Sequence, residues 1–99
     1  MPDVPTYAIE VARTDVERFM STFSVRIAEG DSESTHTVTL SGADWERLGE
    51  GYPSPESLVQ ASFGFLLARE PKEQILASFD ITEIARYFPE YERAISRRR

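Results

Sequence analysis

The chain has 99 residues and a mass of 11.2 kDa, and 40% of its residues are hydrophobic, which suits one folded domain with a single modest core. It contains no cysteine and one histidine, so disulfides, thiolate metal sites and sites that need two imidazoles from one chain are excluded. The longest apolar run, residues 63–68, is far shorter than the roughly 18 residues of a membrane span. Since the first residues lack a signal-peptide pattern, we expect a cytoplasmic protein that contacts no membrane.

The net charge of −6 is unevenly distributed along the chain. Residues 1–50 carry ten acidic side chains against four arginines, whereas residues 51–99 carry seven of each sign. Because an acidic surface repels phosphate backbones, we do not expect broad nucleic-acid binding. The basic tail formed by Arg97, Arg98 and Arg99 is the one candidate for contact with a polyanion.

Residues 1–18 carry two competing patterns. Tyr7, Ile9 and Val11 alternate with small or charged residues, as in a strand, yet apolar residues of this segment also recur at helical spacing. Three alternatives are therefore open: an N-terminal arm, an edge element of a sheet, or a disordered segment. We place the single α+β domain at residues 19–99.

Two alternating segments come next and predict an antiparallel β-hairpin. The first has four apolar side chains on one face, namely Phe19, Phe23, Val25 and Ile27. A polar connection over residues 29–34 leads to residues 35–41, where polar and apolar residues alternate again. Residues 1–18 could add a third strand. Because two or three strands cannot hide one apolar face by themselves, helices are expected to cover it.

The rest of the chain carries clear helix signals. Ser41 and Ser54 are suitable N-caps, Pro55 suits a first helical position, and Asp80 with Glu83 has capping-box spacing. Apolar periodicity predicts helices near residues 44–48, 55–70, 72–79, 81–88 and 91–95. The predicted fold is therefore α+β, with an N-terminal hairpin packed against four to five short C-terminal helices.

Several runs of the sequence carry a resemblance. They are THTVTL at residues 35–40, SFGFLLAREPKEQIL at residues 62–76, FDI at residues 79–81 and YFPEY at residues 87–91. Over residues 19–95 this arrangement resembles a group of short bacterial proteins of uncharacterised function. The resemblance implies a bacterial cytosolic domain, and it implies no activity, cofactor or site residue.

His36 is the only imidazole and thus the main candidate for acid–base chemistry. A catalytic role would pair it with a carboxylate such as Asp44 and with a serine. However, no Gly-x-Ser-x-Gly motif occurs, and we favour a histidine at the rim of the core, bonded to a backbone group. The acidic loop before it lacks the spacing of a calcium loop, and no phosphate-binding glycine motif is present. We expect no enzyme activity and no catalytic residue, cofactor or metal ligand.

Aromatic residues are numerous for so small a core. Phe63 and Phe65 lie two positions apart on one helix, so their rings point about 200° apart and one hairpin cannot cover both. The alternative is that the short helices wrap around both rings. An uncovered aromatic face would form an interface, for which the candidates are Trp45, Phe65, Tyr87, Phe88 and Tyr91.

These observations predict a small non-enzymatic interaction module that self-associates or binds a protein partner through this aromatic helical face. No small-molecule substrate is indicated. The alternative is a nucleic-acid-associated regulator or antitoxin-like protein that uses the C-terminal arginines.

Overall fold

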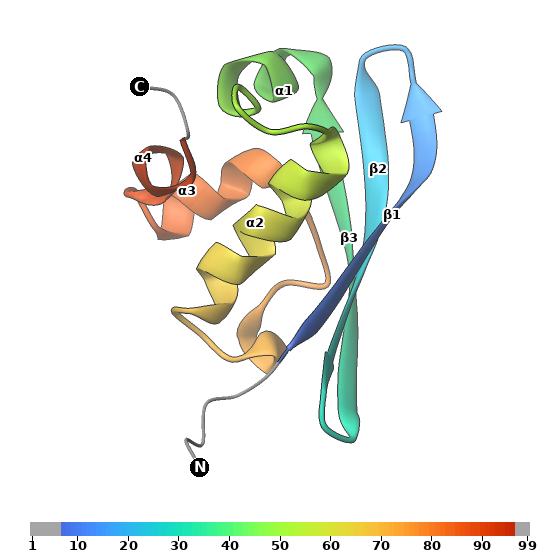
Figure 1. Cartoon of the computed structure of the whole chain (residues 1–99), viewed down its shortest axis with the longest axis vertical. Helices are drawn as coiled ribbons and strands as arrows, with labels where there is room; N and C mark the ends of the chain where they lie inside the picture. The colour runs from blue at the N-terminus through green and yellow to red at the C-terminus, as the bar shows by residue number, and fades with distance from the viewer. Residues whose placement is uncertain (1–6, 97–99) are drawn as a thin grey trace.

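The computed structural model describes residues 7–96 as a four-stranded sheet whose helices all lie on one face (Figure 1). The strands are β1 (Ala8–Glu17), β2 (Met20–Glu29), β3 (Ser32–Ser41) and β4 (Ser78–Asp80). The helices are α1 (Gly42–Leu48), α2 (Pro55–Leu67), α3 (Ile84–Tyr87) and α4 (Tyr91–Ile95), with single 3₁₀ turns η1 (Lys72–Gln74) and η2 (Ile81–Glu83). The α+β class and the hairpin are confirmed, but the sheet has four strands instead of two or three.

The β2–β3 hairpin has longer strands and a shorter turn than the sequence pattern predicts. Glu29 pairs with Ser32, so the turn consists of Gly30 and Asp31 alone. Gly30 has a φ of +59°, a backbone conformation that glycine adopts without a steric penalty. The polar residues on either side, expected to form a loop, continue the strands because a two-residue turn lets them pair.

Strand β1 forms the edge of the sheet, so residues 8–17 adopt one of the three alternatives left open for this part of the chain. Its pairing with β2 contains a bulge: Arg13 lies opposite Phe23 and Asp15 opposite Thr22, which leaves Thr14 as an extra residue. The Thr14 hydroxyl donates a hydrogen bond to the Thr22 carbonyl over 3.3 Å.

The β1–β2 turn is formed by Arg18 and Phe19, because Glu17 pairs with Met20. The expectation that Phe19 belongs to the buried face of a strand is therefore wrong: its side chain is 72% exposed at the turn. The Arg18 guanidinium lies 5.2 Å from the centroid of the Phe19 ring. Val16 is also exposed, so this end of the hairpin presents apolar side chains to solvent.

The core lies between the sheet and α2. Its strand residues are those that alternation places on the inner face, namely Phe23, Val25, Ile27, Val38 and Leu40. Its α2 residues are Leu58, Val59, Phe63, Phe65 and Leu66. The outer face is polar and open to solvent, and there Arg26 pairs with Glu10 and Glu33 across three strands.

Residues 72–79, predicted as a helix, are mostly extended. Only η1 is helical, and Phe79 lies in β4, where it pairs with Val38 in parallel and is buried. The Thr37 amide also donates a hydrogen bond to the Ala77 carbonyl over 2.8 Å. Pairing with the open edge of β3 thus overrides a weak helical pattern, since it satisfies backbone groups that a short helix would leave free.

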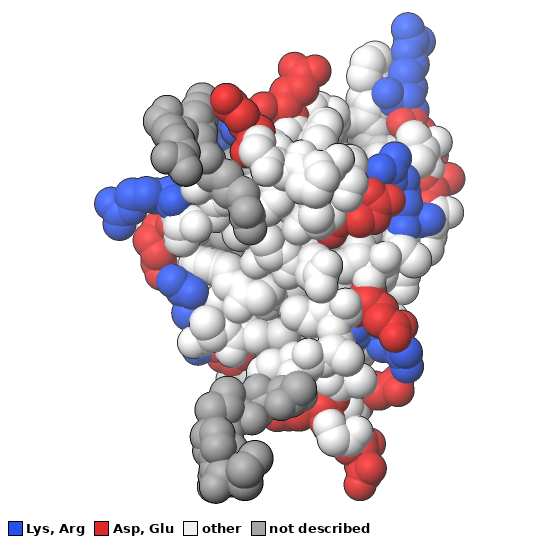
Figure 2. Space-filling view, viewed as in Figure 1, with Lys and Arg blue, Asp and Glu red and all other residues white. Residues whose placement is uncertain are grey.

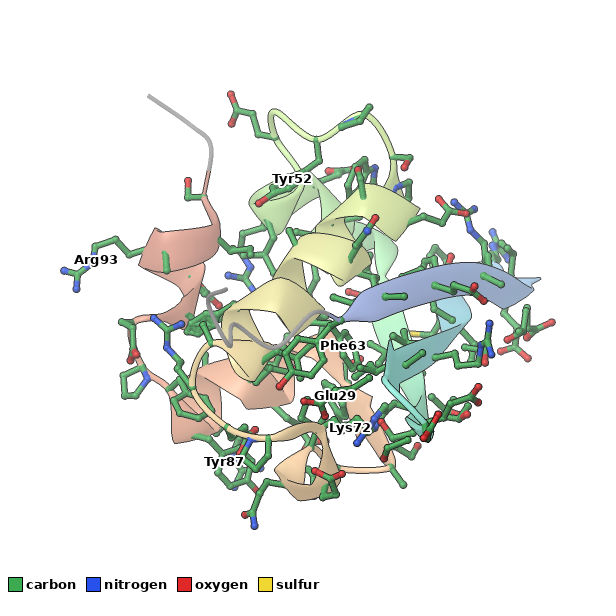
Figure 3. All side chains as sticks on the ribbon, turned by 60° about the horizontal axis from the view of Figure 1, so that its bottom comes forward. Glu29, Tyr52, Phe63, Lys72, Tyr87 and Arg93 are labelled. Carbon is green, nitrogen blue, oxygen red and sulfur yellow. The ribbon has the colours of Figure 1, made fainter. Side chains whose placement is uncertain are left out.

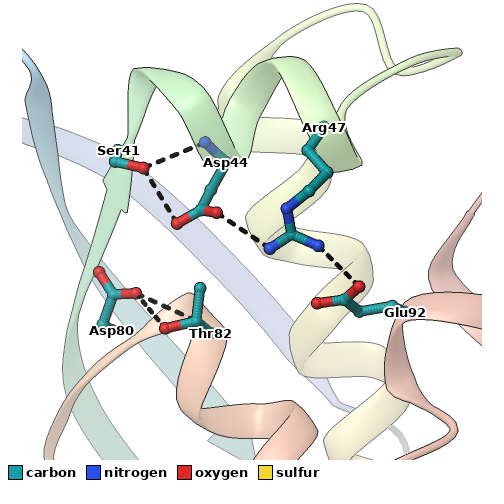
Figure 4. A network of polar contacts seen from close by, with 6 residues as sticks. All are labelled: Ser41, Asp44, Arg47, Asp80, Thr82 and Glu92. Atoms are coloured by element: carbon teal, nitrogen blue, oxygen red, sulfur yellow. Dashed lines mark hydrogen bonds and ion pairs between the residues drawn. The ribbon is translucent and has the colours of Figure 1, made fainter.

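The predicted helix starts are confirmed. The Ser41 hydroxyl accepts from the Asp44 amide, and Ser54 forms a capping box with Ser57 (Figure 4 shows the first). Asp80 and Glu83 form the predicted capping box at η2, which leads directly into α3. Within the described part of the chain, no helix has the length and apolarity that crossing a membrane requires.

Candidate functional site

A groove lies on the helical side of the molecule. It has a volume of about 330 Å³ and runs between the last turn of α2, the segment from Gln74 to Phe79, and α3. This size is at the lower end of the range for ligand pockets, roughly 300 to 1,000 Å³. We call it the α2–α3 groove.

The chain forms this groove because two helices end abruptly on either side of it. Pro71 follows the end of α2 and begins the extended segment that carries Leu76. The Asp80 capping box then starts a new helical segment, and Phe88 ends it with a φ of −132°. The floor between them consists of the buried residues Leu66, Phe79 and Ile84.

Two large apolar side chains stand exposed at the groove. Tyr87 is 65% exposed and Leu76 is 46% exposed, and both line the groove with Phe88. Tyr87 lies at the outer edge of the molecule in Figure 3, well away from the buried ring of Phe63. Apolar side chains that are exposed side by side over an apolar floor are typical of a surface that receives a partner.

The rim of the groove is acidic. Glu70, Gln74 and Glu83 supply its polar lining, and no arginine or lysine belongs to the lining. Glu83 also takes part in the capping box, where it accepts from the Asp80 amide over 3.5 Å. Among the described residues, the Glu70 carboxylate has no hydrogen bond or ion pair. An occupant with an apolar side chain and an adjacent cation would therefore complement the groove.

The structure separates the five predicted interface residues. Tyr87 and the half-buried Phe88 line the groove, whereas Phe65 is 7% exposed and Tyr91 is fully buried. Trp45 is half-buried on α1 and lies against Gly49, where an added Cβ would clash with the indole ring. Phe65, Tyr91 and Trp45 therefore do not line the groove.

The sheet covers one of the two rings of α2, and short helices with one arginine cover the other. Phe63 faces the sheet, with its ring centroid 5.5 Å from that of His36 and 5.8 Å from that of Phe79. Phe65 packs edge-on against Phe88 and Tyr91, and the guanidinium of Arg69 lies 3.5 Å from its ring centroid.

Arg69 is held over the Phe65 ring by polar contacts. It donates to the Phe65 carbonyl over 3.0 Å and pairs with Glu90 over 3.2 Å. Two hydrogen bonds lower the pKa of the Glu90 carboxyl: the larger effect comes from a backbone amide, and the next from Arg69. The arginine thus covers a ring that the hairpin cannot reach.

Tyr91 is fixed in the core by a chain of hydrogen bonds. The Ser62 hydroxyl donates to the Leu58 carbonyl over 2.9 Å, so its one proton is used there. The Tyr91 hydroxyl, 2.7 Å from the same oxygen, must then be the donor to Ser62. Burial raises the pKa of Tyr91 to about 12, although the hydrogen bond to Ser62 acts in the opposite direction.

His36 is buried at the rim of the core, and both of its ring nitrogens are occupied. Nδ1 lies 2.7 Å from the Leu76 carbonyl, which can only accept, so Nδ1 carries the proton. In the neutral ring Nε2 then accepts from the Ser34 hydroxyl over 2.8 Å. The expected bond to a backbone group is confirmed.

The carboxylate that a catalytic role for His36 would recruit is not next to it. Asp44 accepts from Ser41 and pairs with Arg47, which also binds Glu92 of α4 (Figure 4). Neither His36 nor Ser34 lines the α2–α3 groove. His36 therefore has the contacts of a residue that fastens the segment around Leu76 to β3.

Lys72 is the only lysine of the chain, and its side chain is 1% exposed. Its Nζ donates to Ser32 over 2.6 Å, to Glu73 over 2.5 Å and to Glu29 over 3.4 Å (Figure 3 shows it beside Glu29). These contacts, the bond to Glu73 foremost, raise the pKa of Lys72. Sequence reasoning missed this anchor because nothing in the local pattern indicates that a lysine after Pro71 turns inward.

Charges on the rest of the surface are of mixed sign, and several form ion pairs. Figure 2 shows uncharged residues over the middle of the helical face, with acidic and basic groups side by side at its margins. Arg13 pairs with Glu56 at 3.1 Å, which links β1 to α2. Among residues 7–96, no cluster of potential metal ligands is present. The predicted polyanion contact of Arg97, Arg98 and Arg99 lies outside the described residues.

Comparison of the chain with protein-family models, with curated proteins and with solved structures finds no match. The candidate site therefore depends on the geometry of this chain alone.

Proposed function

We propose that the chain is a small non-enzymatic interaction module that binds a protein segment in the α2–α3 groove. The single observation that carries this proposal is the joint exposure of Tyr87 and Leu76 over the buried floor of the groove. Such an arrangement offers apolar area to a partner without any change in the fold. The occupation of both His36 nitrogens by structural hydrogen bonds supports a non-catalytic role.

The experiment compares three forms of the chain by light scattering and by affinity capture. Tyr87→Glu places a charge in the groove beside its acidic rim, and Gln60→Glu places the same charge on an exposed position of α2 outside it. We expect the wild type and Gln60→Glu to self-associate or retain the same captured proteins. Tyr87→Glu should lose them while keeping the wild-type circular dichroism spectrum.

Two results would contradict the proposal. One is a wild type that stays monomeric and retains no protein. The other is a Tyr87→Glu variant that associates and captures as the wild type does.

A further inference from the structure

A second exposed apolar feature lies far from the groove, at the β1–β2 turn. Val16, Phe19 and Met20 are 61%, 72% and 37% exposed, and they lie within five consecutive positions at this end of the hairpin. We call these three residues with Arg18 the hairpin tip. Five large hydrophobic side chains are exposed among the described residues: the three of the hairpin tip, and Leu76 and Tyr87 at the groove.

The hairpin tip and the groove lie well apart on the molecule. In Figure 1 the β1–β2 turn is at the upper right, whereas α3 and the lower end of α2, which contribute to the lining of the groove, are on the left. The two features therefore cannot cover each other within one chain, but each is free to meet the other feature on a second copy.

Their chemistry is complementary. The tip carries an aromatic ring with a guanidinium 5.2 Å from its centroid, and Arg18 forms no ion pair within the described residues. The groove offers an apolar floor beside the Glu70 carboxylate, which also lacks a partner there. By the strand register, Asp15 and Glu17 point to the same face of the hairpin as Met20 and to the opposite face from Val16, so the face of the tip that carries Val16 is free of these acidic residues.

We propose that the α2–α3 groove receives the hairpin tip of a second copy of this chain. Phe19 enters the groove beside Leu76 and Tyr87, and Arg18 pairs with Glu70. This inference rests on the proposed function and names its partner. The contact joins two different surfaces, so it is head-to-tail, and each molecule keeps one free tip or groove for the next.

The contact is small, so association is weak. Interfaces that bury less than about 1,200 Å² in total are typical of transient complexes. We therefore expect the average mass of the wild type to rise steadily with concentration across the micromolar to millimolar range. It should not level off at the mass of a single closed oligomer.

The decisive experiment mixes two defective variants. Phe19→Glu keeps an intact groove but has a blocked tip, and Tyr87→Glu keeps an intact tip but has a blocked groove. Both positions are exposed, so both variants should fold, which circular dichroism and the melting temperature verify. Alone, each variant should be monomeric at every concentration. Mixed in equal amounts, they should form a 1:1 complex with twice the mass of the 11.2 kDa chain.

A charge swap provides the second measurement. The single variants Arg18→Glu and Glu70→Arg should each associate more weakly than the wild type. The chain that carries both substitutions should regain wild-type association. Gln60→Glu serves as a control and should associate as the wild type does.

Three outcomes would overturn the proposal. A wild type that is monomeric throughout, or a mixture of the two variants that stays monomeric while the wild type associates, excludes a tip-to-groove contact. Loss of association in Tyr87→Glu but not in Phe19→Glu means that another occupant fills the groove. Loss of association in Tyr87→Glu alone would still agree with the proposed function. The same is true if the wild type is monomeric but captures another protein through the groove.

Discussion

The core and the α2–α3 groove are built from the same kinds of side chain but differ in what covers them. In the core, Phe63 is fully buried against His36 of β3 and Phe79 of β4, and Phe65 is closed off by Arg69 and two other rings. In the groove, Tyr87 and Leu76 have no such cover. Burial free energy is gained only where water is removed, so the core residues stabilise the fold while the groove residues remain available for a partner.

This difference predicts how substitutions divide between stability and association. Core variants should lower the free energy of unfolding, and groove variants should change association alone. The predictions that follow test this division, from the largest expected change in stability to the smallest.

Phe63→Ala should cause the largest loss, about 3–5 kcal/mol, because it removes a fully buried ring and leaves a cavity beside His36 and Phe79. Urea denaturation followed by circular dichroism measures it. If too little folded protein remains, Phe63→Leu should show a smaller loss in the same direction. A loss below about 1 kcal/mol for Phe63→Ala would mean that the ring is not part of the core.

Alkaline pH should destabilise the chain through Tyr91. Its pKa is raised from 10.0 to about 12 in the folded state, so above pH 10 the unfolded chain loses this proton first. The free energy of unfolding should therefore fall by about 2–3 kcal/mol as pH rises from 10 to 12, at 1.36 kcal/mol per pKa unit. Denaturation at a series of pH values measures this slope.

Tyr91→Phe should show a shallower alkaline slope than the wild type, because the titrating hydroxyl is gone. Tyr87→Phe removes an exposed hydroxyl instead and is the matched control. Equal slopes for the wild type and Tyr91→Phe would contradict the buried position of this hydroxyl.

Ser62→Ala should cost about 1–3 kcal/mol at neutral pH, because the buried Tyr91 hydroxyl loses its acceptor. Adding Tyr91→Phe to Ser62→Ala should restore part of the loss, since no unpaired hydroxyl is then left in the core. A double-mutant cycle measures the coupling between the two positions. Strictly additive losses would show that the two hydroxyls do not interact.

Tyr87→Glu should have the smallest effect on stability, within about 0.5 kcal/mol, because its side chain is 65% exposed. The same variant should abolish association, which light scattering measures. A large loss of stability would place Tyr87 in the core and remove the distinction between the two regions.

Much of the fold follows from local patterns. The Ser41 and Ser54 caps, the Asp80 capping box and the alternation of residues 35–41 depend on neighbours in sequence, and the structure contains all of them. The parallel pairing of Phe79 with β3 does not follow from local patterns, because it depends on a free sheet edge that is distant along the chain.

The candidate site is only partly readable from the sequence for the same reason. Tyr87 and Phe88 were identifiable as excess aromatics, but their spacing gives no sign that Arg69 and Tyr91 would bury Phe65. Leu76 and the exposed Phe19 were missed because both occur in patterns that also fit buried elements. One signal was available for Phe19: it follows Glu17 and Arg18, and charged residues favour a turn at the surface over a buried strand.

The buried lysine gives the chain a natural reporter. Acylating reagents react with a free amine, and the Lys72 amine is enclosed by Glu29, Ser32 and Glu73 with 1% of its side chain exposed. Modification at this position must therefore wait until the segment after α2 separates from the β2–β3 turn. Because the chain has no other lysine, the rate at which this side chain is labelled measures how often that part of the molecule opens.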